Sequence, residues 1–244
     1  MGSGYYAAAT ALVARTQALD AIANNLANVS TVGYRGERTE FRSVLAEAGD
    51  AASSPLEQAE NSYGIMGDVA LDLSQGNLQK TGNELDMAIQ GAGYFVVQTA
   101  RGPMYTRNGS FQVSAKRGLV TASGDPVMGE GGPITLQPGS VSVAPDGTIS
   151  SSGAITGKLQ IVEFPPGTKL TSEGNNLYSA PAKAAQDSTG SDVRQGFLES
   201  SNVNPILGIV ELVTAQRDAE MMQRALSMFN SEMDKTATQD LPKV

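Results

Sequence analysis

The two ends of the chain carry matching heptad patterns of apolar residues, and this limits the folds that the chain can adopt. Asn204-Pro205 is a helix-start signal, because a polar cap residue precedes proline at the first helical position. The apolar residues that follow recur at alternating spacings of three and four, as in a coiled-coil seam. The N-terminal stretch keeps the same register, with one interruption at Arg15. The residues predicted to pack against a second helix are Tyr5, Ala8, Leu12, Leu19, Ile22, Leu26, Leu212, Ala215, Ala219, Met222, Leu226, Phe229 and Met233.

Between the two helical ends the apolar period changes to two. Residues 94–97 form a short apolar strand between glycines, and Asn108-Gly109 and Asp146-Gly147 are typical hairpin turns between alternating residues. Many short strands separated by turn residues indicate an all-β sandwich or barrel. The predicted fold class is therefore α+β, with long terminal helices that pair as a coiled-coil-like hairpin and a central β domain.

This pattern divides the chain into five parts. Small polar residues dominate two stretches that are typical of linkers. The predicted parts are residues 1–35 (N-terminal helix and turn), 36–67 (linker), 68–178 (β domain), 179–195 (return linker) and 196–244 (C-terminal helix and tail).

The composition excludes several kinds of site. The net charge is −8, so no nucleic-acid partner is expected, because phosphate binding needs clustered Lys and Arg. Neither cysteine nor histidine occurs, which excludes a thiol nucleophile, a Cys/His zinc site and a His-based triad. We expect no catalytic, cofactor or metal site and no small-molecule substrate. The absence of cysteine also suits a chain that is exported unfolded.

The N-terminus does not resemble a secretory signal. Its apolar run stops at Arg15, and no basic residue precedes it. If the chain leaves the cytoplasm, we expect it to do so without cleavage of this segment.

Two other classes of function are alternatives for this chain. A glycan-cleaving enzyme would need paired carboxylates, and Asp86, Asp146 and Glu163 are candidates, but nothing in their spacing brings two of them together. No phosphate-binding glycine loop is complete either. The second alternative is a β-sandwich binding or adhesin module whose helices serve only to oligomerise.

Three segments resemble the bacterial flagellar rod and hook family. The first follows the N-terminal helix, the second covers residues 76–121 of the β region, and the third runs from Gln195 into the C-terminal helix. The match covers both ends and the middle of the chain. The motif residues at the two ends are Asn24, Asn25, Leu26, Asn28, Thr31, Gly33, Tyr34, Glu199, Ser201, Asn202, Val203, Gln216, Arg217 and Glu220.

The resemblance implies a structural subunit of the flagellar basal-body rod, a drive shaft that transmits torque across the periplasm. The short chain and residues 127–134 favour a proximal-rod subunit, with a distal-rod subunit as the alternative. It further implies export by the flagellar type III apparatus, and copies of the chain and other rod proteins as partners. One residue departs from the family pattern: Ala219 stands where Tyr or Phe is usual.

Three hypotheses concern the terminal helices. A single pair of them buries too little apolar surface to offset its ordering, so we expect them to become stable only between neighbouring subunits. Arg217 and Glu220 form either a pair between subunits or a local pair on one face of a helix. Asn24, Asn25 and Asn28 either bridge subunits or cap their own helix.

Overall fold

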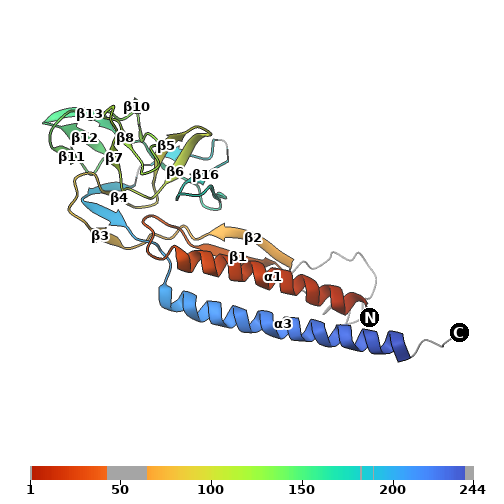
Figure 1. The fold of residues 1–244 in the computed structure, drawn as a ribbon. Coiled ribbons are helices and arrows are strands. Elements are labelled where there is room, and N and C mark those ends of the chain that lie inside the picture. The colour runs from red at the N-terminus through yellow and green to blue at the C-terminus, as the bar shows by residue number, and fades with distance from the viewer. Residues whose placement is uncertain (1, 43–64, 182, 189, 240–244) are drawn as a thin grey trace. The chain divides into compact units, whose positions relative to one another are not determined.

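A computed structural model describes the backbone of residues 2–42, 65–181, 183–188 and 190–239 (Figure 1). It divides into two compact units. The helical unit contains residues 1–27, 37–70 and 204–244, and the β unit contains residues 28–36 and 71–203. The predicted α+β class is confirmed at this level.

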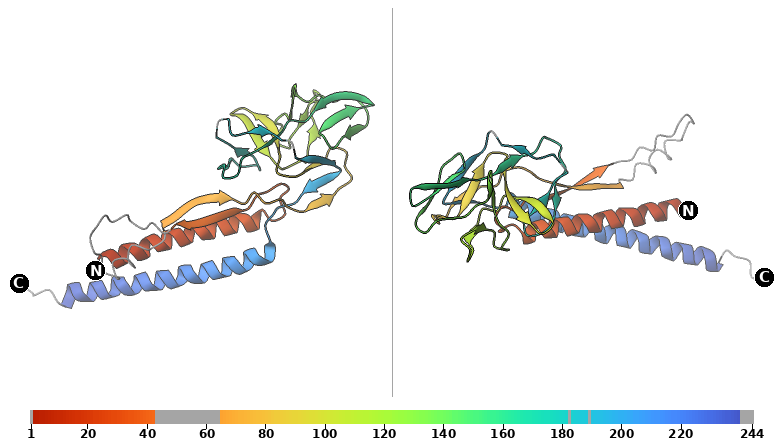
Figure 2. Two further views of the ribbon diagram at one scale, coloured as in Figure 1. Left: turned by 180° about the vertical axis from the view of Figure 1, so that it is seen from behind. Right: turned by 90° about the horizontal axis from the view of Figure 1, so that it is seen from above.

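Two long helices dominate the helical unit. Helices α1 (Gly2–Ala27) and α3 (Pro205–Gln239) lie side by side, and strand β1 (Glu37–Arg42) runs along α1 (Figures 1 and 2). Strand β1 pairs with β2 (Ile65–Leu71) in a two-stranded sheet. Helix α3 begins as predicted, because Oδ1 of Asn204 accepts hydrogen bonds from the N–H groups of Ile206 and Leu207 at 3.0 and 3.2 Å.

The most buried side of α1 is a row of alanines. Ala14, Ala18 and Ala21 are all buried, at spacings of four and three. An alanine side chain ends at Cβ, so neighbouring backbones can approach this side closely. The row lies beside the predicted seam residues rather than on them.

The largest sheet of the β unit has six strands. Their order is β15-β16-β6-β5-β14-β17, and every pairing in it is antiparallel. The strands are β5 (Tyr94–Thr99), β6 (Gly102–Thr106), β14 (Ile161–Glu163), β15 (Thr171–Ser172), β16 (Tyr178–Ser179) and β17 (Gln186–Asp187).

Smaller antiparallel sheets surround it. Three strands pair in the order β11-β12-β13, and β18 and β19 at the end of the unit pair with β4 and β3 near its beginning. The bounds are β3 (Leu78–Lys80), β4 (Met87–Gln90), β7 (Gln112–Val113), β8 (Leu119–Val120), β9 (Met128–Gly129), β10 (Gly132–Pro133), β11 (Val141–Val143), β12 (Thr148–Ser151), β13 (Ala154–Lys158), β18 (Asp192–Gln195) and β19 (Phe197–Glu199).

The apolar core lies between these sheets. One cluster includes Met87, Ile89, Phe95 and Val97, and a second surrounds Tyr94.

One of the two predicted hairpins is confirmed and the other is wrong. Strands β11 and β12 pair across Asp146-Gly147, where Gly147 has φ +84°. Asn108-Gly109 joins no hairpin, because β6 pairs with β5 and β16, whereas β7 pairs with β8. Gly109 is instead required by a close approach: an added Cβ would lie 1.6 Å from the carbonyl oxygen of Met87. Asn108-Gly109 therefore allows two segments of backbone to lie close together, and it does not form a hairpin turn.

The predicted boundaries differ from the observed units. Residues 179–195 contain β17 and β18, so they are part of the sheet structure and not a linker. Residues 28–35 and 196–203 belong to the β unit rather than to the helices. Strand β1 and part of β2 occupy the predicted linker 36–67, whose residues 43–64 lie outside the described residues.

Candidate functional site

The predicted seam of α3 lies on the least exposed side of that helix. Ala215 and Ala219 are buried, and Leu212, Met222 and Leu226 are half-buried. On α1 the corresponding residues Leu12, Leu19, Ile22 and Leu26 are half-buried. The side chains of Tyr5, Ala8, Phe229 and Met233 lie outside the described residues.

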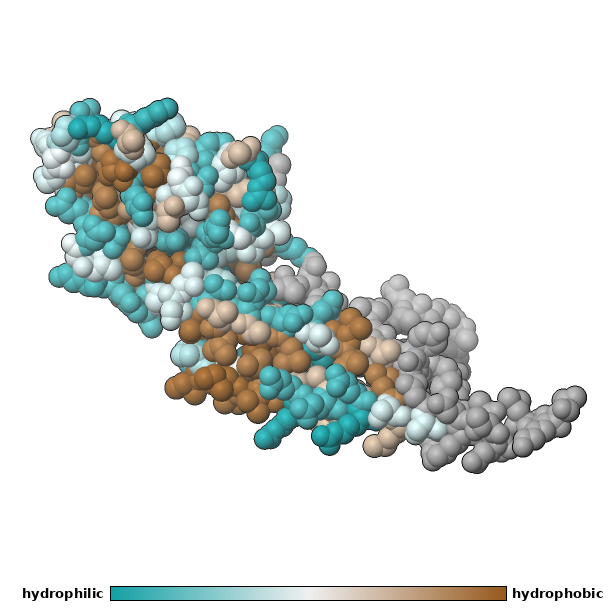
Figure 3. Space-filling view, in the orientation of Figure 1, coloured by the Kyte–Doolittle hydropathy of each residue, from teal (hydrophilic) through white to brown (hydrophobic). Residues whose placement is uncertain are grey.

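A second side of α3 is apolar and exposed to solvent. Ile206 is 76 % exposed, and four more large apolar residues follow it within two turns of the helix. Apolar surface gathers on this part of the helical unit in Figure 3. A contiguous exposed patch of this kind marks an interaction site. We call it the apolar face of α3; it consists of Ile206, Leu207, Ile209, Val210 and Val213.

Charged residues contribute a specific contact between the helices. Nη1 of Arg15, the residue that interrupts the seam, lies 3.6 Å from Oδ2 of Asp218. Of the two alternatives for Arg217 and Glu220, the local pair is not formed, because Glu220 lies 3.6 Å from Arg224, one turn further along. The pair between subunits stays a prediction. Arg217 and Gln216 are exposed on α3.

The motif asparagines at the end of α1 have separate roles. The side-chain amide of Asn25 pairs with the backbone of Glu37: its Oδ1 accepts the Glu37 N–H at 2.7 Å, and its Nδ2 donates to the Glu37 carbonyl at 2.8 Å. Asn28 accepts hydrogen bonds from Thr31 through both its carbonyl and its side chain, which forms the turn after the helix. Asn24 is exposed on α1.

The centre of the β unit holds a buried cluster of three charges. Oε1 of Glu199 lies 2.7 Å from Nη1 of Arg35, and Oε2 lies 3.1 Å from Nη1 of Arg107. All three side chains are at most 1 % exposed. The guanidinium N–H groups of Arg35 are not aligned as hydrogen bonds to any described residue, so the contact of this guanidinium with Glu199 is an ion pair and not a hydrogen bond. We call these residues the charge cluster.

Further contacts fix the second arginine. Nη2 of Arg107 donates to the carbonyl of Gly91 at 2.6 Å, and its guanidinium lies over the ring of Tyr94, 4.8 Å from the centroid. Burial lowers the pKa of Arg107 from its usual value; Glu199 opposes this shift and Arg35 adds to it. The carboxylate of Glu199 is therefore the counter-ion of two guanidinium groups.

Several other motif residues lie next to Arg35 and Glu199 in the sequence. The Gly33 N–H donates to the carbonyl of Glu199 at 2.8 Å, and the Arg35 N–H donates to the hydroxyl of Tyr178 at 3.0 Å. Asn202 accepts the Gly36 N–H at 2.8 Å and donates to two carbonyls of the segment that follows β2. Tyr34 and Ser201 are buried, and the Ser201 hydroxyl accepts the Val203 N–H.

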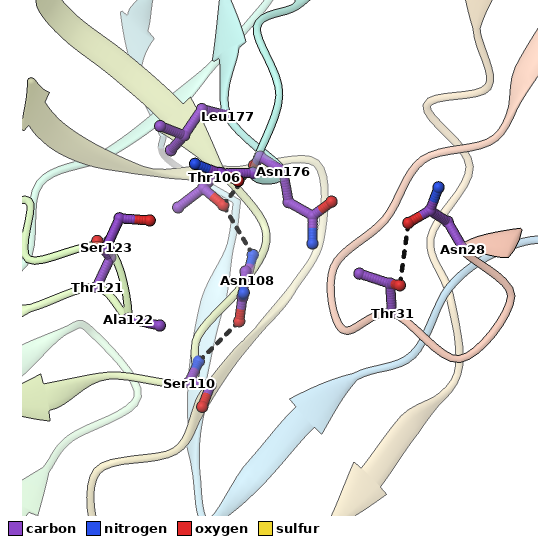
Figure 4. A pocket seen from close by; sticks show the side chains of 11 residues that line it. Asn28, Thr31, Thr106, Asn108, Ser110, Thr121, Ala122, Ser123, Asn176 and Leu177 are labelled. Carbon is purple, nitrogen blue, oxygen red and sulfur yellow. Dashed lines mark hydrogen bonds between the residues drawn. The ribbon is translucent and has the colours of Figure 1, made fainter. Parts of the chain in front are cut away.

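A polar pocket of about 350 Å³ lies in the β unit (Figure 4). Its walls carry hydroxyl and amide groups, and no charged or aromatic side chain lines it. In Figure 4 Asn28 and Thr31 lie on one side of the view, and Thr106, Asn108 and Ser110 form a wall in the middle. Thr121, Ala122 and Ser123 lie on the other side. Hydrogen bonds within the wall, from Thr106 to the Asn176 carbonyl and from Ser110 to Asn108, hold these side chains in place.

The three carboxylates weighed for catalysis each have a local structural contact. Asp86 accepts hydrogen bonds from Thr81 and Asn83. Hydrogen bonds from Thr148 lower the pKa of Asp146, and those from Ser188 and Ser191 lower the pKa of Glu163. A general acid needs the opposite shift.

Neither a metal site nor a membrane-spanning helix is found among the described residues. They contain no group of three acidic side chains placed to hold a metal ion. Neither helix, over its described length, is apolar enough to cross a membrane.

Comparisons with protein-family models match three parts of the chain. Residues 6–35 match the flagella basal body rod protein model, and residues 88–156 match the flagellar hook protein FlgE/F/G D1 domain. Residues 194–240 match the flagellar basal body rod FlgEFG protein C-terminal model. A FlgF protein of Caulobacter vibrioides is 34 % identical to the chain, over 93 % of this chain and 92 % of that protein. The chain belongs to the flagellar basal-body rod family.

Further rod proteins are similar to the chain over most of its length. A FlgF protein of Mesorhizobium japonicum is 32 % identical over 96 % of each chain. A FlgG protein of Agrobacterium fabrum is 34 % identical over 90 % of this chain and 92 % of that protein. The chain is FlgF-like and is a structural subunit of the basal-body rod. Rod proteins form a structural family and not an enzyme class.

The two arginines of the charge cluster were absent from the residues singled out by sequence. Arg35 precedes Gly36 and Arg107 precedes Asn108-Gly109, in segments that match the rod family, so both positions resemble turns. No pattern in the sequence marked the two arginines as buried, and the burial of their neighbours Tyr34 and Thr106 is visible only in the structure.

Proposed function

We propose that this rod subunit joins copies of itself and other rod proteins through the apolar face of α3. Five large apolar side chains exposed over two turns are the observation that carries the proposal. In water such a face is unfavourable, and burying it against a neighbouring helix would stabilise the contact by about 1.5–3 kcal/mol for each side chain that becomes fully buried. At 3.6 residues per turn, this face lies roughly opposite the side of α3 that contains Ala215 and Ala219, so α3 has surface for a second helix.

The motif and seam residues have assigned parts in this proposal. Leu212, Ala215, Ala219, Met222 and Leu226 pair α3 with α1 in a coiled-coil-like hairpin, and the apolar face of α3 contacts the next subunit. Arg217 and Gln216, both exposed, extend that surface with polar groups. Because one such contact is not self-complementary, its repetition builds a helical tube. The strands of the β unit would form a sandwich or barrel-like outer layer.

The place of the subunit in the cell is also proposed. FlgF proteins are prominent among the relatives, which supports a proximal-rod position, with the distal rod as the alternative because FlgG proteins also match. The rod would span the periplasm and transmit torque. Export would use the flagellar type III apparatus without cleavage of a signal peptide, with no catalytic activity of the subunit involved.

A substitution on the apolar face tests the assembly proposal. Ile209→Glu places a charge on the face, whereas Gln223→Glu places the same charge at another exposed position of α3. In a strain that lacks the native subunit, Ile209→Glu should abolish motility and leave isolated basal bodies with an incomplete rod. Gln223→Glu should support normal motility and a complete rod. Normal rods built from Ile209→Glu would refute the proposed contact.

A map of the basal body tests the position. Electron cryo-microscopy of isolated basal bodies should place the chain in the membrane-proximal part of the rod. Density for the chain at the hook end of the rod would favour the distal alternative.

A further inference from the structure

Glu199 connects parts of the β unit that lie far apart in the sequence. Its carboxylate contacts Arg35 and Arg107 and accepts the Gly76 N–H at 2.7 Å, and its carbonyl accepts the Gly33 N–H. These partners come from the beginning, the first third and the middle of the unit. Glu199 itself belongs to its last strand.

The segment around Glu199 completes several sheets at once. We call residues 192–203 the closing segment. Strand β18 pairs with β4, and β19 pairs with β3. The Val193 N–H donates to the carbonyl of Pro145 at 2.8 Å, and the Gly196 N–H donates to that of Asp86 at 2.8 Å. Earlier strands thus find their edge partners only when the closing segment is present.

Packing of the β unit depends on the closing segment for its charge as well as for its strands. Arg35 and Arg107 are both buried, and within the described residues Glu199 is the carboxylate at ion-pair distance from either. Without it the packed unit would hold two guanidinium groups, close enough to repel one another, away from water. A buried charge without a counter-charge is among the most destabilising features in proteins.

We infer that Glu199 is a folding lock: the β unit packs its core only when the closing segment brings this carboxylate between the two arginines. A chain delivered N-terminus first would then stay unpacked until nearly the whole unit has arrived. The use of this delay in export rests on the proposed function, whereas the lock itself does not.

The full-length chain allows a direct test. Glu199→Gln removes the charge with little change in size, and Glu173→Gln is the control, because Glu173 pairs with Arg101 where both side chains contact solvent. The readout is amide hydrogen exchange in β5 and β6, which do not pair with the closing segment. For Glu199→Gln the folded-to-unfolded ratio of the unit should fall about 10²- to 10³-fold, and the protection factors throughout β5 and β6 should fall by the same factor. Glu173→Gln should retain that protection.

A second variant separates the charge balance from a general loss of packing. Arg35→Met, Arg107→Met and Glu199→Met together remove all three charges and should restore protection in β5 and β6. The inference is overturned if β5 and β6 stay protected in Glu199→Gln, if the charge-free variant fails to fold, or if Glu173→Gln is equally damaging. Ile209→Glu should leave these measurements unchanged, so failure of the assembly proposal is distinguishable from failure of the lock.

Discussion

Nη1 of Arg35 lies 2.7 Å from Oε1 of Glu199, and neither side chain is exposed to solvent. Arg35 is the last residue of the segment that matches the rod protein model, and Glu199 lies in the segment that matches the C-terminal model. The two signatures of the family, at opposite ends of the sequence, therefore meet in one buried contact of the β unit. This explains why motif residues that precede and follow helices are not themselves helical.

Gly33 lies at a position that excludes any side chain. Its φ is +69°, and an added Cβ would lie 2.4 Å from the backbone nitrogen of Asn108. Gly33→Ala should lower the free energy of unfolding of the β unit by about 2 to 4 kcal/mol, through backbone strain and steric overlap. The measurement is a denaturant titration followed by near-ultraviolet circular dichroism.

Gly167→Ala is the matched control for this substitution. Gly167 also has a positive φ, +84°, but a Cβ there would meet nothing within 4 Å. Gly167→Ala should lower the free energy of unfolding by about 1 kcal/mol, because an alanine at positive φ is strained even where nothing overlaps with its Cβ. Equal losses in the two variants would contradict the role of the close approach to Asn108.

Stability of the β unit should fall at alkaline pH because of Tyr178. Burial raises the pKa of this hydroxyl from 10.0 to about 12, and its hydrogen bond with the Arg35 N–H acts in the opposite direction. Between these values the folded state keeps a proton that the unfolded state has lost. The contribution is fully present below pH 10 and decreases above it, by at most about 1.4 kcal/mol per pH unit.

Denaturant midpoints measured between about pH 9 and about pH 11.5 test this dependence. Tyr178→Phe should be less stable at neutral pH, because it loses the acceptor for the Arg35 N–H, but its midpoint should change less with pH. Burial also raises the pKa of Tyr105, so a smaller slope should remain in the variant. An unchanged slope in Tyr178→Phe would refute the assignment.

The side-chain amide of Asn25 should protect the backbone N–H of Glu37 from hydrogen exchange. Its two hydrogen bonds to Glu37 replace the pairing that a neighbouring strand would give. Asn25→Ala should raise the hydrogen-exchange rate of the Glu37 amide and cost about 1 to 3 kcal/mol of local stability. Gln17→Ala, on the exposed side of α1, should change neither quantity. Retained protection of Glu37 in Asn25→Ala would show that another group holds this segment.

The terminal helices should be weakly protected in the isolated subunit. The buried side chains of α1 and α3, over the described residues, are alanines, and the large apolar side chains of the apolar face of α3 remain in water. Amides of residues 5–26 and 206–233 should therefore exchange quickly in the monomer and slowly in assembled rods. Strong protection of these residues in the monomer would contradict the prediction.

Some features followed directly from local patterns in the sequence. Asn204-Pro205 starts α3, and Asp146-Gly147 joins β11 to β12, because capping and turn formation depend on residues within a few positions of one another. The heptad spacing also identified the side of α3 that contains Ala215 and Ala219. The family followed from motifs that span the chain.

Other features depended on distant contacts. The Asn108-Gly109 hairpin was wrong because the carbonyl of Met87, far from the turn in sequence, needs the space at Gly109. The predicted return linker contains strands because β17 and β18 find partners in β14 and β4. Short polar strands of this kind carry little apolar periodicity, so only their partners reveal them.

By itself, the sequence determined the two long helices, the β-rich middle, the absence of Cys and His chemistry, and membership of the rod family. Only the tertiary structure decided that Arg35, Arg107 and Glu199 form one buried cluster and that residues 28–36 belong with the sheets. Helix periodicity and turns arise from neighbouring residues, whereas the burial of a charge is settled by which distant segment supplies its counter-ion.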